Sequence, residues 1–185
     1  VSPMYGGLPR YADGSPLETD PSKSFAKAHY EQHTAVTGTI RVGDEVIDLD
    51  GLGLRDKSWG PRYWQALTWY RWLPMIFSPD FAMMISVIER DGAISRSGMV
   101  LVGDEYHQIR DCTIDSDYDD DGYQTAMRCS VTTDHDTYEV DGDVISMIPL
   151  RSRRTTPDGD ELHTRITEAM TRFECNGQRG IGMSE

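Results

Sequence analysis

The stretch Gln65-Ala66-Leu67-Thr68-Trp69-Tyr70-Arg71-Trp72-Leu73-Pro74-Met75-Ile76-Phe77 decides the fold. Along a β-strand, alternate residues point to opposite sides, so this segment divides into two faces. One face holds Leu67, Trp69, Arg71 and Leu73, and the other holds Ala66, Thr68, Tyr70, Trp72 and Ile76. Neither face is hydrophilic, which is typical of a barrel strand with an apolar outer layer and an aromatic, partly polar lumen.

Turn signals separate the strand-like segments on both sides of this stretch. Asp or Asn beside Gly marks these turns, at Gly43-Asp44, Asp91-Gly92, Asp141-Gly142 and Asn176-Gly177. Such dipeptides favour tight β-hairpins, and they imply about eight to ten strands at hairpin spacing. No helical periodicity persists after residue 30. We therefore expect an all-β fold, either a sandwich or an up-and-down antiparallel β-barrel, and the alternation favours the barrel.

The N-terminal residues have a different composition. Residues 1–24 are rich in Gly, Pro, Ser and Asp. We expect residues 1–28 to form an extended lead-in or linker, with a short helix near Ser24–His29, and residues 29–185 to form the barrel. The chain begins with Val1 rather than Met, which favours a piece of a longer protein.

Bulk composition excludes several classes of partner. The chain has 185 residues, which suits one large domain, and its 38% hydrophobic content is enough for a core. A formal charge of -13 repels nucleic acid and anionic lipid. No apolar run approaches the ~20 residues that span a membrane. The odd count of three cysteines favours free thiols in a reducing cytoplasm.

The segment Gly51–Trp64 combines glycines, indoles and charges. Exposed indole and unpaired buried charge are both costly. We therefore expect a fixed turn that places polar groups at the edge of an aromatic-lined cavity. Arg55 and Asp56 are either a structural ion pair or a tuned acid/base pair, in which burial raises the pKa of Asp56 while Arg55 or Arg62 lowers it.

Aromatic and methionine side chains predict where an apolar ligand would bind. Five large rings (Trp59, Trp64, Trp69, Tyr70 and Trp72) lie within a short span, and core packing is the simpler interpretation for any one of them. All five cannot enter one small core, so some must line a lumen or a subunit interface. Met83 adds adaptable apolar surface beside them.

Two acidic motifs resemble metal sites only in part. On a strand, His29, Glu31 and His33 would share one face and could hold a metal, but the zincin spacing fails. We therefore expect no metal there, and either a hydrogen-bond network or a proton-transfer role for Glu31. The segment Asp117–Gly122 opens like a calcium loop, but Arg128 stands where the closing Glu should be, so we expect a solvated turn.

The string Arg55-Asp56-Lys57-Ser58-Trp59-Gly60-Pro61-Arg62 resembles the RDHSWG-R signature of a bacterial lipocalin-like family related to carotenoid 1,2-hydratases, kievitone hydratase and AttH-type proteins. The resemblance extends to His29-Tyr30-Glu31-Gln32, Tyr70-Arg71-Trp72 and Gly180–Glu185. It implies a lipocalin-like (calycin-type) barrel, the C-terminal half of a tandem pair, whose N-terminal barrel lies elsewhere in the protein or on a separate chain. Family members hydrate, dehydrate, isomerise or cyclise apolar substrates without a metal or organic cofactor. Lys57 stands where the family usually has His.

The sequence and the resemblance together predict a cofactor-independent hydratase, dehydratase or isomerase of a terpenoid- or polyketide-like molecule. The expected catalytic residues are Asp56, Arg55, Glu31 and Tyr70. The expected substrate-binding residues are Trp59, Arg62, Trp64, Trp69, Trp72 and Met83. The alternatives are a non-catalytic carrier of a hydrophobic molecule and a half-domain that docks on an N-terminal barrel, and a homo-oligomer is a further open alternative.

Overall fold

The computed structural model describes residues 5–7, 28–60, 62–156 and 158–185, and most of them lie in β-strands. The elements in chain order are β1 (Tyr5–Gly7), β2 (Ala28–Val42), β3 (Glu45–Trp59), the 3-10 helix η1 (Trp64–Ala66), β4 (Trp69–Ser78), β5 (Phe81–Arg90), β6 (Ala93–Val102), β7 (Glu105–Tyr118), β8 (Gln124–Thr133), β9 (Thr137–Thr155), β10 (Glu161–Cys175) and β11 (Gln178–Ser184).

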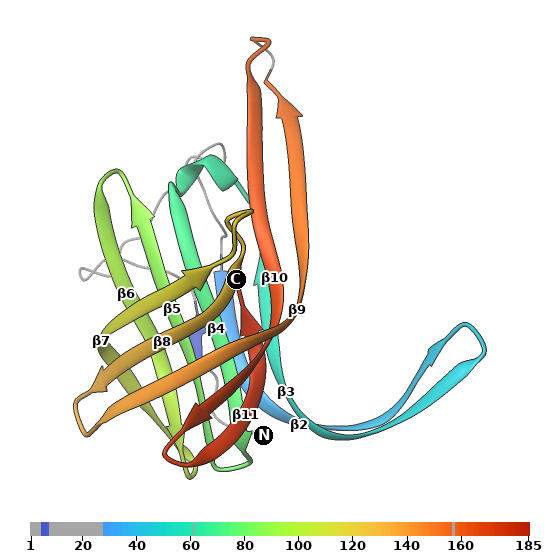
Figure 1. Ribbon diagram of the computed structural model, residues 1–185, viewed down its shortest axis with the longest axis vertical. Coiled ribbons are helices and arrows are strands. Elements are labelled where there is room, and N and C mark those ends of the chain that lie inside the picture. The colour runs from blue at the N-terminus through green and yellow to red at the C-terminus, as the bar shows by residue number, and fades with distance from the viewer. Residues whose placement is uncertain (1–4, 8–27, 61, 157) are drawn as a thin grey trace.

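Strands β4 to β11 form a closed antiparallel barrel (Figure 1). Each strand pairs with the next one along the chain, and β11 returns to pair with β4 through Ile181↔Ile76 and Gly182↔Met75. The predicted up-and-down barrel is therefore confirmed. Turns at Asp91-Gly92 and Asn176-Gly177 join consecutive strands as predicted, and both Asp91 and Asn176 adopt positive φ.

Aliphatic and sulfur-containing side chains fill the barrel interior. Leu73 and Met75 from β4 pack with Met83 and Ile85 from β5 and with Phe173 from β10, and all five are fully buried. An eight-stranded barrel is just wide enough for side chains to fill it. The interior expected from the sequence, a hollow lined by indoles, is therefore wrong for this part of the barrel, which is packed.

A separate three-stranded sheet, in the order β1-β2-β3, lies outside the barrel wall. The first half of β2 crosses the outer face of the barrel. There, Trp72 of β4 donates to Glu31, and the His33 N–H donates to the hydroxyl of Tyr106 of β7. Met84 and Met99 are buried although they lie opposite the interior positions, so the outer face of the barrel is also covered at these residues. The far end of the β2–β3 hairpin projects away from the barrel (Figure 1).

Several local predictions are wrong. The turn predicted at Asp141-Gly142 is not formed, because both residues lie inside β9 and pair with β8 and β10 on its two sides. Gly51–Trp59 is the second half of β3 rather than a fixed turn, because β3 pairs residue by residue with β2 as far as Trp59↔Ala28. This pairing satisfies the backbone groups that a turn would leave to side chains. The helix predicted near Ser24–His29 is not formed at Ala28 and His29, which begin β2, and the rest of it lies outside the described residues. The aromatic segment also starts later than predicted, since β4 begins at Trp69 after η1.

Within the described ranges, no helix is long and apolar enough to cross a membrane. Cys112, Cys129 and Cys175 are free thiols and all are buried. Burial raises the pKa of each of these thiols, which keeps them protonated and unreactive.

The seam between β11 and β4 depends on glycine. A Cβ placed on Gly182 would lie 1.9 Å from the carbonyl oxygen of Pro74. We predict that Gly182→Ala lowers the free energy of unfolding by about 2 kcal/mol or more, because backbone must move to relieve the clash. Gly51→Ala is the matched control, since a Cβ there meets nothing within 4 Å. Urea denaturation measures both variants, and equal stabilities would contradict this account of the seam.

Candidate functional site

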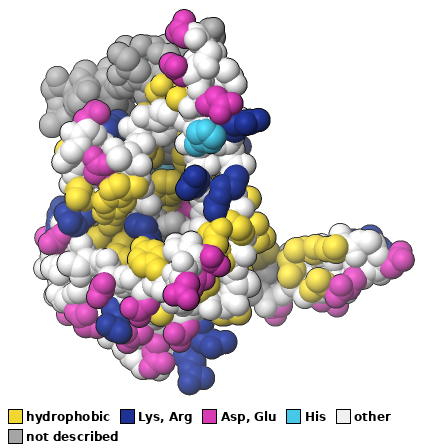
Figure 2. All heavy atoms as spheres, turned by 45° about the horizontal axis from the view of Figure 1, so that its top comes forward, with side chains coloured by type: hydrophobic (Ala, Val, Ile, Leu, Met, Phe, Trp, Pro, Cys, Tyr) yellow, Lys and Arg dark blue, Asp and Glu magenta, His cyan; other side chains and the backbone are white. Residues whose placement is uncertain are grey.

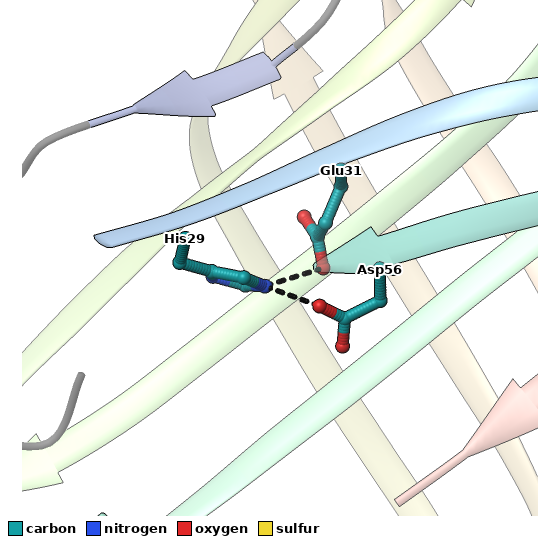
Figure 3. A group of neighbouring side chains, drawn as sticks. All are labelled: His29, Glu31 and Asp56. Atoms are coloured by element: carbon teal, nitrogen blue, oxygen red, sulfur yellow. Dashed lines mark hydrogen bonds and ion pairs between the residues drawn. The ribbon is translucent and has the colours of Figure 1, made fainter. Parts of the chain in front are cut away.

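The β2–β3 register gathers three ionisable side chains on one face of the hairpin. Glu31 pairs directly with Asp56 across the two strands, so both side chains point to the same side. His29 lies two residues before Glu31 on β2 and therefore shares that face. Figure 3 shows the three side chains converging between β2 and β3.

The distances in this group define a compact cluster. A hydrogen bond of 2.8 Å joins His29 Nε2 to Asp56 Oδ1, and the same nitrogen lies 3.8 Å from Glu31 Oε1. Trp72 Nε1 donates to Glu31 Oε1 at 2.6 Å from the barrel side. The Glu31 side chain is only 2% exposed, whereas His29 and Asp56 are each about 40% exposed. A buried carboxyl thus reaches water through a half-exposed histidine–aspartate pair.

The surroundings of Glu31 and His29 raise the pKa of both side chains. Burial raises the pKa of Glu31, and the Trp72 hydrogen bond and the His29 charge oppose that rise only in part. The hydrogen bond to Asp56 raises the pKa of His29, against the opposing effect of burial. Glu31 and His29 therefore hold protons closer to neutral pH than free side chains do. Groups tuned in this way are suited to acid/base chemistry.

A second ionisable pair, the Tyr70 hydroxyl and the Glu185 carboxyl, lies on β4 and at the end of β11. The backbone of Trp72 exchanges two hydrogen bonds with that of Glu185, so Glu185 is placed next to the strand that carries Trp72. The Tyr70 hydroxyl donates to Glu185 Oε1 at 2.5 Å. Burial raises the pKa of Glu185, and burial together with the Glu185 hydrogen bond raises the pKa of Tyr70. The charge of Asp56 also acts on Glu185, so the two groups are electrostatically coupled.

Tyr70 and Glu185 line a pocket of about 340 Å³ at the mouth of the barrel. The pocket lies between η1, the beginning of β4 and the upper part of β10. Its remaining walls are Trp64, Gln65, Leu67, Thr68, Trp69, Arg71, Tyr118, Gly122, Gln124, His163, Thr164, Arg165, Ile166 and Thr167. Figure 2 turns this end toward the viewer and shows the hollow with apolar and basic side chains at its edge. Its size lies in the lower part of the ~300–1,000 Å³ range of small-molecule pockets.

The predicted site residues divide into two groups. Trp64, Trp69 and Tyr70 line the pocket, and Trp72 binds Glu31 on the outer face of the barrel. Arg62 donates to Ser58, its guanidinium carbon lies 6.0 Å from the Trp64 ring centroid, and its charge acts on Tyr70 and Glu185.

Other predicted residues lie apart from the pocket. Arg55 faces the opposite side of β3 from Asp56 and lies 5.3 Å from the Tyr30 ring centroid. Trp59 meets the edge of the same Tyr30 ring and is 47% exposed. Met83 is fully buried in the packed core. Asp56 is not in a desolvated aromatic mouth, and its cationic partner is His29 rather than Arg55, because alternation along β3 separates the side chains of neighbouring residues.

Sequence reasoning missed Glu185 as a site residue. The resemblance included this residue within Gly180–Glu185, but no spacing linked it to Tyr70, which lies 115 positions earlier. The only signal was a carboxylate directly after an apolar strand.

The His29 cluster also has a donor set that a metal ion could use. One donor atom each from His29, Glu31 and Asp56 lies within 4.8 Å of the others. His33, which was considered as a third ligand, instead places its Nδ1 3.1 Å from the Tyr106 hydroxyl. Glu31 Oε1 already accepts the Trp72 indole N–H, so the described contacts satisfy this group without a metal.

One known protein family matches nearly the whole chain. Residues 4–185 match the model of a family described as a domain of unknown function, DUF7064. No curated protein matches the chain. Because the match spans nearly the whole sequence, the chain belongs to the DUF7064 family.

Proposed function

We propose that this chain is the barrel domain of an acid/base enzyme that hydrates, dehydrates or isomerises an apolar small molecule without a cofactor. One observation carries the proposal: Glu31 and Glu185 both lie against β4, Glu31 through the Trp72 indole and Glu185 through the Trp72 backbone and the Tyr70 hydroxyl, and burial raises the pKa of each carboxyl. Buried carboxyls with raised pKa values are the groups that donate protons near neutral pH.

The mouth pocket is the proposed substrate site. Trp64 and Trp69 supply apolar walls, and Glu185 supplies the acid. In a hydration, the Glu185 carboxyl gives its proton to one carbon of a C=C bond, and a water molecule adds to the other carbon and returns a proton to the carboxylate. In an isomerisation, the proton returns from a neighbouring carbon instead. Tyr70 donates to Glu185 and so stabilises the carboxylate that forms in either case.

The His29 cluster has a proposed supporting role. The hydrogen bond to Asp56 raises the pKa of His29, and His29 lies 3.8 Å from Glu31. Both exposed members contact solvent, so they exchange protons with bulk water. Through its charge, Asp56 also raises the pKa of Glu185. Removing the Asp56 carboxyl therefore lowers the proton affinity of Glu185 in the pocket. The buried free thiols fit the proposed cytoplasmic setting.

A non-catalytic carrier is the second candidate, because the same pocket and apolar walls suffice for binding alone. A carrier needs no group of raised pKa, and it leaves its ligand chemically unchanged. Solvent deuterium distinguishes the two functions, since acid/base turnover transfers solvent protons to carbon.

We predict that the complete protein incorporates deuterium into its co-purified ligand in D2O. Glu185→Gln should slow this incorporation about 10²- to 10⁴-fold, because the variant cannot donate a proton. Mass spectrometry of the ligand measures the rate. Glu174→Gln, an exposed glutamate at the other end of β10, is the control and should retain the wild-type rate. A wild-type protein that returns its ligand free of deuterium at every pH would be a carrier.

The raised pKa of Glu31 also predicts a pH dependence of stability. The folded state holds the Glu31 proton more tightly than the unfolded chain, whose ordinary pKa is 4.5. Its contribution is therefore complete below about pH 4.5 and is lost as the pH rises through the folded pKa. His29 has the same sign, with loss beginning above its ordinary value of 6.5.

We therefore expect the free energy of unfolding to fall more steeply between pH 4.5 and pH 8 in the wild type than in Glu31→Gln. Urea denaturation across this range provides the test, with Glu174→Gln as the matched control. Parallel curves for the wild type and Glu31→Gln would show that Glu31 ionises as it does in the unfolded chain.

A docking role toward an N-terminal lipocalin-like barrel is a separate proposal, supported by the projecting end of β2–β3. One face of this hairpin is apolar and exposed, with Val36 39%, Ile40 46%, Val42 63% and Ile47 41% exposed. The register places all four side chains on the same face. The opposite face carries Thr39 and Asp48. An amphipathic hairpin end that projects away from the barrel is typical of an interaction surface.

In the complete protein, we predict that the amides of residues 36–47 are protected from hydrogen exchange. Ile40→Lys combined with Ile47→Lys should remove this protection, because the charges cannot enter an apolar interface. Thr39→Lys on the polar face should leave it intact. Rapid exchange of this segment in the wild-type complete protein would exclude the docking role.

A further inference from the structure

We infer that the ligand of the mouth pocket is an amphiphile that carries an oxyanion, such as a carboxylate, sulfonate or phosphate group, and that Arg71 and Arg165 bind this group. The inference rests on the proposed function only in taking the pocket as the ligand site. It adds the substrate class, which neither the sequence nor the family match provides.

The upper part of β10 carries basic residues over the pocket. Ala169, Thr171 and Phe173 are buried, so the odd-numbered residues of β10 face the barrel interior. The same alternation directs Arg165 toward the mouth, where it lines the pocket. Arg151 of β9 pairs with Arg165 and therefore lies on the same face. Figure 2 shows basic and histidine side chains beside the hollow on this side of the molecule.

Arg71 of β4 also lines the pocket, and neutral groups hold its guanidinium. Its Nη2 donates to Gln124 Oε1 at 2.6 Å, and its Nη1 donates to Ser116 and Tyr118 at 3.2 and 3.3 Å. Its Nε is buried and has no hydrogen-bond partner among the described residues. A half-buried guanidinium without a counter-ion is costly, so this site is electrostatically incomplete without an anion.

Arg151 of β9 and Arg165 of β10 add positive charge on the β9–β10 side of the pocket. Among the described residues, neither Arg165 nor Arg151 forms an ion pair, and Arg151 donates to the neutral hydroxyl of Tyr123 at 2.7 Å. Arg96 and Arg110, by contrast, each pair with an aspartate. Of the arginines without such a pair, Arg71 and Arg165 line the pocket. Planar guanidinium groups suit the recognition of carboxylate and phosphate oxygens.

Acidic side chains also lie near the pocket. Glu161 lies 3.6 Å from Arg153 and 3.7 Å from His163, and His163 itself lines the pocket. Glu185 lines the pocket too, and burial raises its pKa. The charge of Glu168 raises the pKa values of Glu185 and Tyr70. Among the described residues, none of these carboxylates forms an ion pair with Arg71 or Arg165, so both guanidinium groups can bind a ligand.

The remaining walls accommodate an apolar body. Trp64, Leu67, Trp69, Tyr118 and Ile166 line the same pocket. Apolar walls with a few convergent polar groups orient a ligand, because the polar groups fix one end of it. In this arrangement, the oxyanion lies at Arg71 and Arg165, and the apolar part lies against the indoles near Glu185.

Two fluorescent probes that share an anilinonaphthalene skeleton test the inference. 8-Anilinonaphthalene-1-sulfonate carries an oxyanion, and N-phenyl-1-naphthylamine lacks it. We expect the purified wild-type protein to bind the sulfonate more tightly than the neutral probe. Arg165→Gln should weaken sulfonate binding about tenfold, the effect of losing one charged hydrogen bond, and leave the neutral probe unchanged. Arg179→Gln, an exposed residue of β11, is the matched control and should change neither affinity.

Competition identifies the source of the oxyanion. Decanoate or decyl phosphate should displace the sulfonate probe, whereas decanol should not. The inference is overturned if Arg165→Gln affects both probes equally or neither, or if no anionic amphiphile displaces the probe. Because the probes undergo no reaction, this outcome is independent of the acid/base proposal. Arg165 is exposed, so a melting temperature equal to that of the wild type confirms that the variant is folded.

Discussion

The hydrogen bond from the Trp72 indole to the buried Glu31 carboxyl holds the arrangement together. It joins two sheets that share no backbone pairing, since β2 belongs to the outer sheet and β4 to the barrel. Burying a carboxyl is costly unless its oxygens find donors, so the hairpin can cross the barrel at this point only with the indole in place. The same contact places His29 and Asp56 beside β4. The site therefore exists because the two sheets meet through this polar bond and through the contact of His33 with the Tyr106 hydroxyl.

The barrel provides a rigid frame for this contact. Its interior is packed with aliphatic and sulfur-containing side chains, and its seam is closed by the approach of Gly182 to Pro74. Closure brings the end of β11 against β4, and this places Glu185 within hydrogen-bond distance of Tyr70. The pocket lies at the mouth of this packed barrel, beside η1, the beginning of β4 and the upper part of β10. Fold and site are thus consequences of the same strand closure.

Much of this fold could be predicted from the sequence, because turn dipeptides and alternation are local signals. The turn at Gly43-Asp44 also fixes the register that pairs Glu31 with Asp56. Asp56 was nevertheless expected to lie in a turn, because the whole segment Gly51–Trp64 was interpreted as one. The interpretation of Gly51–Trp59 as a turn rested on its composition. The β2 residues that pair with this segment are not adjacent to it in sequence, so the pairing gave no local signal. The partners Trp72 and Glu185 could not be predicted, since only tertiary packing brings them to β2 and Tyr70. The alternation placed Arg71 on the same face as Leu73, but its neutral partners on β7 and β8 could not be predicted, because they depend on tertiary packing.

The protonation state of Glu31 tests the central claim most directly. A carbon-13 NMR titration of the glutamate carboxyl carbons, assigned with Glu31→Gln, measures it in the folded protein. The account predicts a midpoint for Glu31 above its ordinary value of 4.5, because burial disfavours the carboxylate more than Trp72 and His29 stabilise it. A midpoint at or below 4.5 would show that Glu31 is an ordinary ionised partner of His29, and it would contradict the account.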